Sequence, residues 1–275
     1  MIDYSNCKIN IGLEIISKRD DGYHNIESIF YPIPLFDIIE LLPNDNGFEL
    51  IQSGVIVEGK VEDNLVYKAW KLLNQKYNFG GVKIHLHKTI PMGAGLGGGS
   101  ANAAKVLQMI NKEFSLEITD IELQIIASEI GSDCPFFIQN TPVFAYNTGT
   151  EFKPSKLDLS GYYIVIVKPE LSISSQEAYS GISPQEAKVD LRNIDKIPLS
   201  DWKGKVRNVF EKQVFIKNHV LNKIKENFYT KGAVYASMSG SGSSIYGIFP
   251  NEIDISTFPS EYFIWQSVIS NICNS

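Results

Sequence analysis

The sequence has few cysteines and no long apolar segment. The three cysteines are Cys7, Cys134 and Cys273. Their number is odd and no two of them have a CxxC spacing, which argues against a disulfide framework or a zinc knuckle. No apolar run approaches the ~20 residues that a membrane helix needs. The N-terminus also lacks the charged-then-apolar order of a signal peptide. We therefore expect a cytoplasmic protein that does not act at a membrane.

Clustered charge of one sign is missing as well. The 275 residues carry a formal net charge of -6, and the 25 lysines and arginines are scattered along the chain. Nucleic-acid-binding proteins gather positive charge on one face or along one helix, so nucleic acid is not an expected partner. With 44% hydrophobic residues and no low-complexity tract, the chain can bury a sizeable core, and its length favours two domains.

Periodic patterns in the first half predict alternating strands and helices. Apolar residues alternate with polar ones over residues 8–15, which predicts a strand with Lys8 and Asn10 on its non-core face. Helical spacing over residues 63–77 predicts a helix capped by Asp63. A strand is expected to end near Lys88. An apolar stripe of Ala103, Leu107 and Ile110 predicts a helix from Ser100 onward, and a further helix should begin at the Thr119–Glu122 capping box and end at Gly131.

The second half contains the pieces of a split βαβ arrangement. A strand is expected in YYIVIVKP, and helices around residues 206–229. Two apolar runs flank the turn-like SGSGS of residues 239–243, and a last strand lies near YFIWQSVI. The polar, turn-rich residues 147–161 mark the predicted boundary, which divides the chain into domains at 1–153 and 154–275.

The most informative segment is PMGAGLGGGSANAAKVL, residues 91–107. It places five glycines in nine positions between a predicted strand and the start of a predicted helix. Glycines let the backbone approach a ligand, and helix N-terminal amides favour an anion, so we expect a phosphate site. A mobile loop or tight helix–sheet packing is the simpler alternative.

Common phosphate-binding patterns fit this segment poorly. Gly93, Gly95 and Gly98 satisfy GxGxxG, but Pro91 and a short connector separate them from the strand. No Lys followed by Ser or Thr completes a P-loop, and the HRD and DFG motifs of protein kinases are absent. A dinucleotide-binding dehydrogenase or a catalytically silent nucleotide-binding module stays open on these patterns alone.

Three segments resemble, in order, the three motifs of the GHMP kinases, which include galactokinase, homoserine kinase and mevalonate kinase. They are KINIGLEIISKRDDGYHNIES (residues 8–28), the glycine segment, and SMSGSGSSIYGIF (residues 237–249). The spellings GLGGGSANAA, RDDGYH and GSDCPFF are most similar to the branch whose substrate is a cytidine-diphosphate alcohol of the non-mevalonate isoprenoid route.

The resemblance implies a fold and an activity. The expected fold is the α+β, two-domain GHMP kinase fold, with an N-terminal ribosomal protein S5 domain 2-like domain and a C-terminal ferredoxin-like domain. The expected activity is ATP-dependent phosphorylation of the 2-hydroxyl of the cytidine-diphosphate substrate. The nearest alternative is a GHMP kinase with another alcohol substrate.

Site residues follow from the same resemblance. Asp133 matches the aspartate that accepts the proton of the substrate hydroxyl, and Lys8 the lysine that orients both groups. The residues that would wrap the ATP phosphates, with the Ser100 hydroxyl near a phosphate or Mg²⁺, are Pro91, Met92, Gly93, Ala94, Gly95, Leu96, Gly97, Gly98, Gly99, Ser100 and Ala101. We expect Mg²⁺ to arrive with the nucleotide, since no pair of carboxylates identifies a metal cage.

The substrate-binding residues implied by the resemblance are Asn10, Tyr23, His24, Tyr179 and Gly240. Tyr23 and His24 would help form the cytidine pocket, with Tyr179 as its other aromatic wall. From residue type alone, the simpler interpretations are packing for the aromatic rings, a turn or cap for Asp133 and Ser100, and solvation for Lys8.

Two further hypotheses concern histidine and cysteine. His85 and His87 lie two apart on a strand, but no third ligand is suggested nearby, so we interpret them as surface residues rather than a metal site. Cys7 and Cys134 directly neighbour Lys8 and Asp133. On that adjacency alone, alkylation of these thiols is expected to affect activity.

Overall fold

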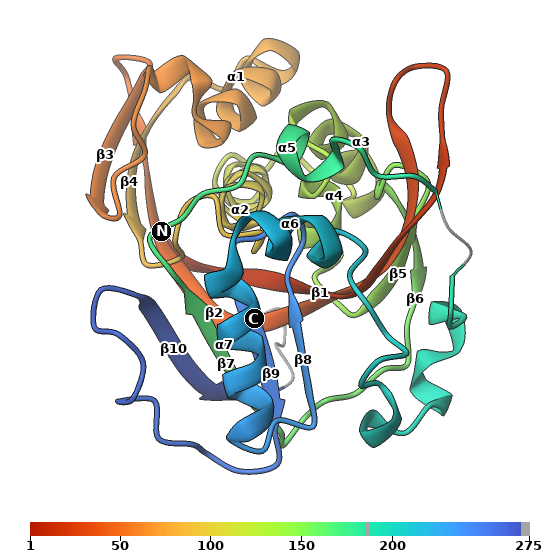
Figure 1. Ribbon diagram of the computed structural model, residues 1–275. Helices are drawn as coiled ribbons and strands as arrows, with labels where there is room; N and C mark the ends of the chain where they lie inside the picture. The colour runs from red at the N-terminus through yellow and green to blue at the C-terminus, as the bar shows by residue number, and fades with distance from the viewer. Residues whose placement is uncertain (185–186, 271–275) are drawn as a thin grey trace. The chain divides into compact units, whose positions relative to one another are not determined.

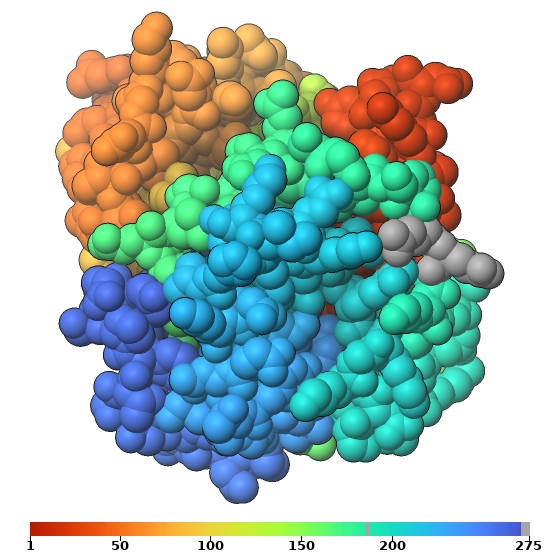
Figure 2. All heavy atoms as spheres, in the orientation of Figure 1, coloured from red at the N-terminus to blue at the C-terminus, as the bar shows by residue number. Residues whose placement is uncertain are grey.

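The computed structural model describes residues 1–184 and 187–270 (Figure 1 and Figure 2). The chain forms two compact units, each assembled from separate stretches. Unit 1 comprises residues 1–7, 35–92 and 97–141, and unit 2 comprises residues 8–34, 93–96 and those from 142 onward. Cys273 lies outside the described residues, while Cys7 and Cys134 are buried and are not joined to each other by a disulfide.

Two long strands belong to both units. Strand β1 (Ile2–Lys18) starts in unit 1 and continues in unit 2, whereas β2 (His24–Asn44) starts in unit 2 and ends in unit 1. The two strands pair with each other. The chain therefore passes from one unit to the other along regular strands.

Unit 1 combines strands with four helices. Strand β4 (Gly81–Lys88) runs parallel to β3 (Phe48–Gly54) and antiparallel to the end of β2. The helices are α1 (Leu65–Tyr77), α2 (Gly98–Glu113), α3 (Asp120–Ile130) and α4 (Cys134–Gln139), with a short 3₁₀ turn η1 (Val61–Asp63) before α1. Helix α2 packs against the other three helices.

Unit 2 holds the rest of the first sheet and a second, fully antiparallel sheet. Strand β5 (Val143–Tyr146) pairs with the start of β2, and β6 (Glu151–Pro154) pairs with β5. The second sheet has the order β10-β7-β9-β8, formed by Phe263–Val268, Tyr163–Lys168, Ile245–Phe249 and Tyr235–Met238.

Helices cover one face of this second sheet. Helix α7 (His219–Thr230) packs on β8 and β9 and lies across the sheet in Figure 1. Shorter elements complete the unit: α5 (Ser175–Tyr179), η2 (Leu191–Lys196), η3 (Leu199–Asp201) and α6 (Glu211–Lys217). The core between helices and sheet includes Val165, Phe228 and Phe249.

Helix starts differ from the sequence prediction in two places. Helix α1 begins at Leu65, because Asn64 has extended backbone and its side chain accepts a bond from the Val66 amide, so Asp63 is not the cap. Helix α2 begins at Gly98, so Ser100 lies inside its first turn and does not cap it. The capping box of Thr119 and Glu122 is confirmed, as is the C-cap at Gly131.

The prediction that Lys8 and Asn10 lie on an exposed strand face was wrong. Lys8 is 3% exposed and Asn10 2% exposed. Segments distant in the sequence lie against the strand here: the Lys8 amide donates to the Leu96 carbonyl oxygen, the Asn10 amide donates to the Ser239 hydroxyl, and Gly240 lies beside the Asn10 side chain. Both faces of β1 are therefore buried near these two residues.

Candidate active site

Two glycine-rich segments meet in unit 2. The Ser239 hydroxyl donates to the Gly95 carbonyl oxygen at 2.8 Å, and the Ser244 amide donates to the Ala94 carbonyl oxygen at 3.2 Å. Gly95 has a φ of +73°, and a Cβ there would lie 2.0 Å from the Ser239 carbonyl oxygen. Only glycine fits at this position, so the close approach of the two segments depends on it.

Strand β1 brings Lys8 and Asn10 to the same place. The Lys8 ammonium group donates to the Asn10 side-chain oxygen at 2.6 Å and lies 4.5 Å from the centre of the Phe30 ring. A buried ammonium group needs such partners, because leaving water without them is costly. The Lys8 side chain is thus held in one position beside residues 93–96 and 239–244.

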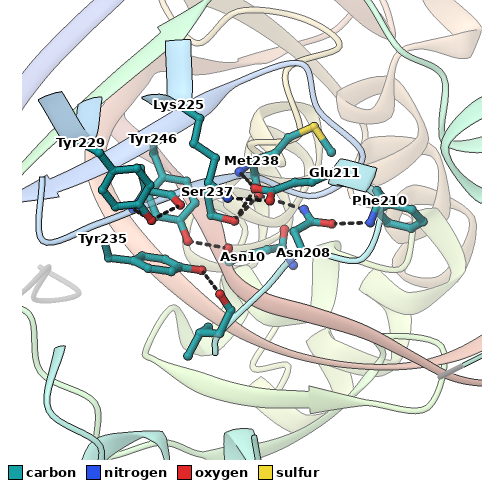
Figure 3. Close-up of polar contacts among 12 residues, drawn as sticks. Asn10, Asn208, Phe210, Glu211, Lys225, Tyr229, Tyr235, Ser237, Met238 and Tyr246 are labelled. Atoms are coloured by element: carbon teal, nitrogen blue, oxygen red, sulfur yellow. Dashed lines mark hydrogen bonds and ion pairs between the residues drawn. The ribbon is translucent and has the colours of Figure 1, made fainter. Parts of the chain in front are cut away.

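Asn10 is fixed by a buried hydrogen-bond network. Its side-chain nitrogen donates to the Ser28 hydroxyl at 3.0 Å, and Ser28 donates to the Gly12 carbonyl oxygen at 2.6 Å. The Tyr246 hydroxyl donates to the Asn10 carbonyl oxygen at 2.8 Å (Figure 3). Burial raises the pKa of Tyr246 well above its usual value, so this residue stays a neutral donor.

Gly240 lies against the residues just described. A Cβ on Gly240 would be 3.2 Å from the Gly95 carbonyl oxygen and 3.4 Å from the side-chain oxygen of Asn10. Unit 2 therefore brings together Lys8, Asn10, Gly95 and Gly240, all of which the sequence analysis singled out.

The rest of the glycine segment forms the N-terminus of α2 in unit 1. Gly97 adopts a left-handed conformation with a φ of 71° and precedes the helix. Unpaired amides at the start of a 16-residue helix, together with its dipole, favour an anion. This geometry supports the expected phosphate site. Ala101 is buried behind it, whereas Met92 is 42% exposed.

Asp133 and Ser100 belong to neighbouring helices of unit 1. Asp133 is half-buried and directly precedes α4, which packs against α2. The thiol of the next residue, Cys134, lies close to the Ser100 side chain. The segment that carries Asp133 therefore lies near the first turn of α2.

The predicted cytidine-binding aromatics are only partly brought together. His24 stacks on Tyr179, with ring centres 5.1 Å apart and planes at 24°, and Tyr179 meets Phe210 edge-on at 4.8 Å. Tyr23 is 66% exposed and lies in the turn before β2, where its amide donates to Asp21. The paired rings of His24 and Tyr179 offer an aromatic surface.

Several residues of this network were missed in the sequence analysis. Ser28 and Ser239 lie in the recognised motifs, but no pattern identified their hydroxyl groups as links between segments. Asn208 donates to the Gly240 carbonyl oxygen at 2.8 Å and Tyr246 to Asn10, and no local signal marks either residue. Contacts over such sequence separations leave no periodic trace.

Neither a metal cage nor a membrane helix is found in the part of the chain that the structure describes. Within residues 1–184 and 187–270, no cluster of three or more His, Cys, Asp or Glu residues could hold a metal ion. His85 and His87 both contact the Ser53 hydroxyl, at 2.8 and 2.9 Å. Among the same residues, no helix combines the length and the apolar character needed to cross a membrane.

The fold and the two glycine-rich loops define a GHMP kinase. The family model described as "GHMP kinases N terminal domain" matches residues 64–146, and "GHMP kinases C terminal" matches residues 191–260. A mevalonate kinase structure from Methanococcus jannaschii has a TM-score of 0.66 at 15% identity and covers 98% of both chains. The expected two-domain α+β fold is confirmed.

More similar relatives identify the branch. 4-Diphosphocytidyl-2-C-methyl-D-erythritol kinase of Parabacteroides distasonis is 47% identical, covering 98% of this chain and 100% of its own. The Bacteroides fragilis enzyme of the same name is also 47% identical, over 95% and 96%. A crystal structure of 4-(cytidine 5'-diphospho)-2C-methyl-D-erythritol kinase has a TM-score of 0.77 at 29% identity and covers 90% of each chain. The chain belongs to this family of GHMP kinases.

Proposed function

We propose that this chain transfers the γ-phosphoryl group of ATP to the 2-hydroxyl of 4-diphosphocytidyl-2-C-methyl-D-erythritol. This reaction belongs to the non-mevalonate route of isoprenoid precursor synthesis. The observation that carries the proposal is the 47% identity, over 98% of this chain, to a relative named for that substrate. The alternative GHMP kinases in the structural comparison share only the fold, at about 15% identity.

ATP is assigned to the glycine segment and the start of α2. The amides of residues 93–101 would bind its phosphates, and the dipole of α2 would favour their negative charge. Pro91 and Met92 lead into this loop, and the Ser100 hydroxyl would lie beside a phosphate. The contacts of Ser239 and Ser244 with Gly95 and Ala94 support a loop held in one conformation.

Lys8 and Asp133 are proposed as the residues that act on the reacting hydroxyl. Asp133 would accept the proton that leaves the substrate as the new oxygen–phosphorus bond forms. Lys8 would orient the hydroxyl and stabilise negative charge during transfer. The fixed position of the Lys8 ammonium group beside Asn10 supports this role, because a preorganised charge needs no rearrangement during the reaction.

The cytidine diphosphate group is assigned to unit 2. The stacked rings of His24 and Tyr179 would hold the base, with Tyr23 closing over it from the turn. Asn10 and Gly240 would lie nearer the phosphates. The contact that a Gly240 Cβ would make with the Asn10 side-chain oxygen supports a shared role for these two residues.

Magnesium is proposed to enter with the nucleotide. The described residues offer no acidic cage for the ion, and Mg²⁺ commonly keeps phosphate and water ligands. When bound, it would neutralise phosphate charge, and the Ser100 hydroxyl is the group of this chain best suited to lie near it. The protein's own contribution is to bind and orient the phosphates.

The test is direct detection of the product. Purified protein is incubated with Mg-ATP and the cytidine-diphosphate alcohol, and the 2-phosphate is sought by mass spectrometry. Wild type and the exposed-site control Asp120→Asn should form product, whereas Asp133→Asn should lose most of the rate. If wild type binds ATP but forms no product, the substrate assignment fails, and other small alcohols should be tested.

A further inference from the structure

Residues 207–211, RNVFE, have no role in the reaction proposed above, yet they contact several of its parts within unit 2. The segment pairs with β1, because the Leu13 amide donates to the Arg207 carbonyl oxygen at 2.8 Å and the Val209 amide donates to Leu13 at 2.9 Å. Arg207 also forms two hydrogen bonds, at 2.8 and 3.0 Å, with the Glu14 carboxylate. The segment is therefore fixed to the strand that carries Lys8 and Asn10.

Asn208 connects this segment to the serine-glycine loop. Its side-chain nitrogen donates to the carbonyl oxygens of Met238 at 2.9 Å and Gly240 at 2.8 Å. Its side-chain oxygen accepts from the Phe210 amide at 3.0 Å (Figure 3). Asn208 is 3% exposed, so these bonds are shielded from water. The two carbonyl groups flank Ser239, the residue that joins the loop to Gly95.

Glu211 holds the other side of the same peptide segment. Its carboxylate accepts from the Met238 amide at 2.8 Å and from the Ser237 hydroxyl at 3.0 Å. The Lys225 ammonium group lies 2.6 Å from the second carboxylate oxygen and balances its charge. Figure 3 shows Asn208 and Glu211 converging on Met238. The amide and the carbonyl of Met238 are thus both bound by side chains.

We infer that Asn208 and Glu211 are positioning residues for phosphoryl transfer. They fix the backbone of Met238–Gly240 and, through it, the placement of Ser239 and Gly240 against Gly95 and Asn10. Phosphoryl transfer depends on exact placement of the groups around the phosphate, and a displacement of about 1 Å costs on the order of 100-fold in rate. The inference rests on the proposed function, since it assigns a task within that site.

Two substitutions at one position test the inference. Asn208→Ala removes both donors at every pH. Asn208→Asp keeps the shape but sets one carboxylate oxygen against two carbonyl oxygens, and burial with this repulsion raises the pKa of the introduced carboxyl group. When protonated, that group can again donate one bond. The charged groups nearby, Glu211 with Lys225 and Arg207 with Glu14, are unchanged in both variants.

The expected kinetic result is a loss in kcat with a pH signature. Asn208→Ala should lower kcat about tenfold or more at every pH, with a much smaller change in KM for ATP. Asn208→Asp should be slower still at pH 8.5 and approach the Asn208→Ala rate by pH 6. The control is Asn222→Asp, the same change at an exposed residue that lines, with Asn208 and Glu211, a cavity of about 690 Å³. Its kcat should match wild type.

Folding and function are separated by two further measurements. Circular dichroism at each pH gives the folded fraction of each variant. The inference is wrong if the loss of activity is fully explained by a loss of folded protein. It is also wrong if both Asn208 variants keep the wild-type kcat. Should Asn208→Asp not fold, Asn208→Ala alone decides. If wild type forms no product, the proposed function fails, and amide hydrogen exchange of residues 239–244 then decides. Asn208→Ala should accelerate that exchange and Asn222→Asp should not; unchanged exchange would overturn the inference.

Discussion

The Lys88 ammonium group lies 2.6 Å from a carboxylate oxygen of Asp37, and both side chains are at most 2% exposed. Asp37 also accepts bonds from the backbone amides of Thr89 and Ile90 at 2.7 and 2.8 Å. The Asn102 side chain on α2 contacts both partners, at 2.9 Å each. This network joins the chain just before the glycine segment to the helix just after it.

Removal of Lys88 should destabilise the protein strongly. Lys88→Met leaves a buried carboxylate without its counterion, which costs about 3–5 kcal/mol. The matched control is Lys83→Met on the same strand, where the partner is Glu49 and both side chains are more than 40% exposed. Such pairs contribute about 0–1 kcal/mol. Urea unfolding measures both, and equal effects would show that the buried pair is not special.

Gly95→Ala should be much more harmful than a glycine replacement that has space. Gly95 combines a φ of +73° with a would-be Cβ contact of 2.0 Å to backbone. Gly161 has a φ of +86° but no atom within 4 Å of a Cβ, so Gly161→Ala reports backbone strain alone, about 1–2 kcal/mol. Thermal unfolding should show a larger loss for Gly95→Ala. Equal decreases in the unfolding temperature of the two variants would mean that the loop of residues 93–96 and the loop of residues 239–244 can move apart at little cost in free energy.

Local signals identified the elements of this fold well. The Thr119–Glu122 capping box is visible in the sequence because its partners are three residues apart. Alternation of apolar and polar residues likewise located part of β1, and apolar runs located the four strands of the second sheet. The cap of α1 was misassigned because Asp63 and Asn64 are both good caps, and only the backbone shows that Asn64 takes the position.

The environment of the site residues could not be predicted in the same way. Alternation correctly placed Lys8 and Asn10 on one face of β1, but what covers that face comes from residues 93–96 and 239–244. Asn10 and Ser239 are 229 positions apart, and no spacing rule connects them. The resemblance to the GHMP kinase motifs singled out Lys8 and Asn10 as site residues. Asn208 and Glu211 could be identified only from their contacts with Met238 in the structure.

The burial of Cys7 and Cys134 argues against the expected sensitivity of activity to alkylation of these thiols. Both thiols are buried, and burial raises the pKa of Cys134 to about 12. The thiolate is the reactive form, so the raised pKa keeps the Cys134 thiol protonated and poorly reactive at pH 8. In a Cys273→Ser background, iodoacetamide should label the native protein negligibly and label two cysteines after unfolding in urea. Rapid native labelling, detected by mass spectrometry, would contradict this expectation.

The same burial predicts a fall in stability at alkaline pH. The folded state binds the Cys134 proton more tightly than the unfolded chain, whose thiol titrates near 9.0. The stability that the protonated Cys134 thiol contributes is fully present below pH 9 and declines as the pH rises from there toward about 12. Cys134→Ser should flatten that part of the profile, which urea unfolding between pH 8 and 10.5 can measure. An unchanged slope would assign the decline to other groups.

Tyr179 should control affinity for the cytidine group if the proposed function holds. Its ring stacks on His24 and is supported edge-on by Phe210. Stacking of a base on an aromatic ring is worth about 1–3 kcal/mol, so Tyr179→Ala should raise KM for the cytidine substrate roughly tenfold, with KM for ATP unchanged. Tyr179→Phe keeps the ring and should stay near wild type. Tyr4→Ala, at a residue 57% exposed in unit 1, is the control. Equal KM values for Tyr179→Ala and wild type would remove Tyr179 from the cytidine pocket while leaving the phosphate loops unaffected.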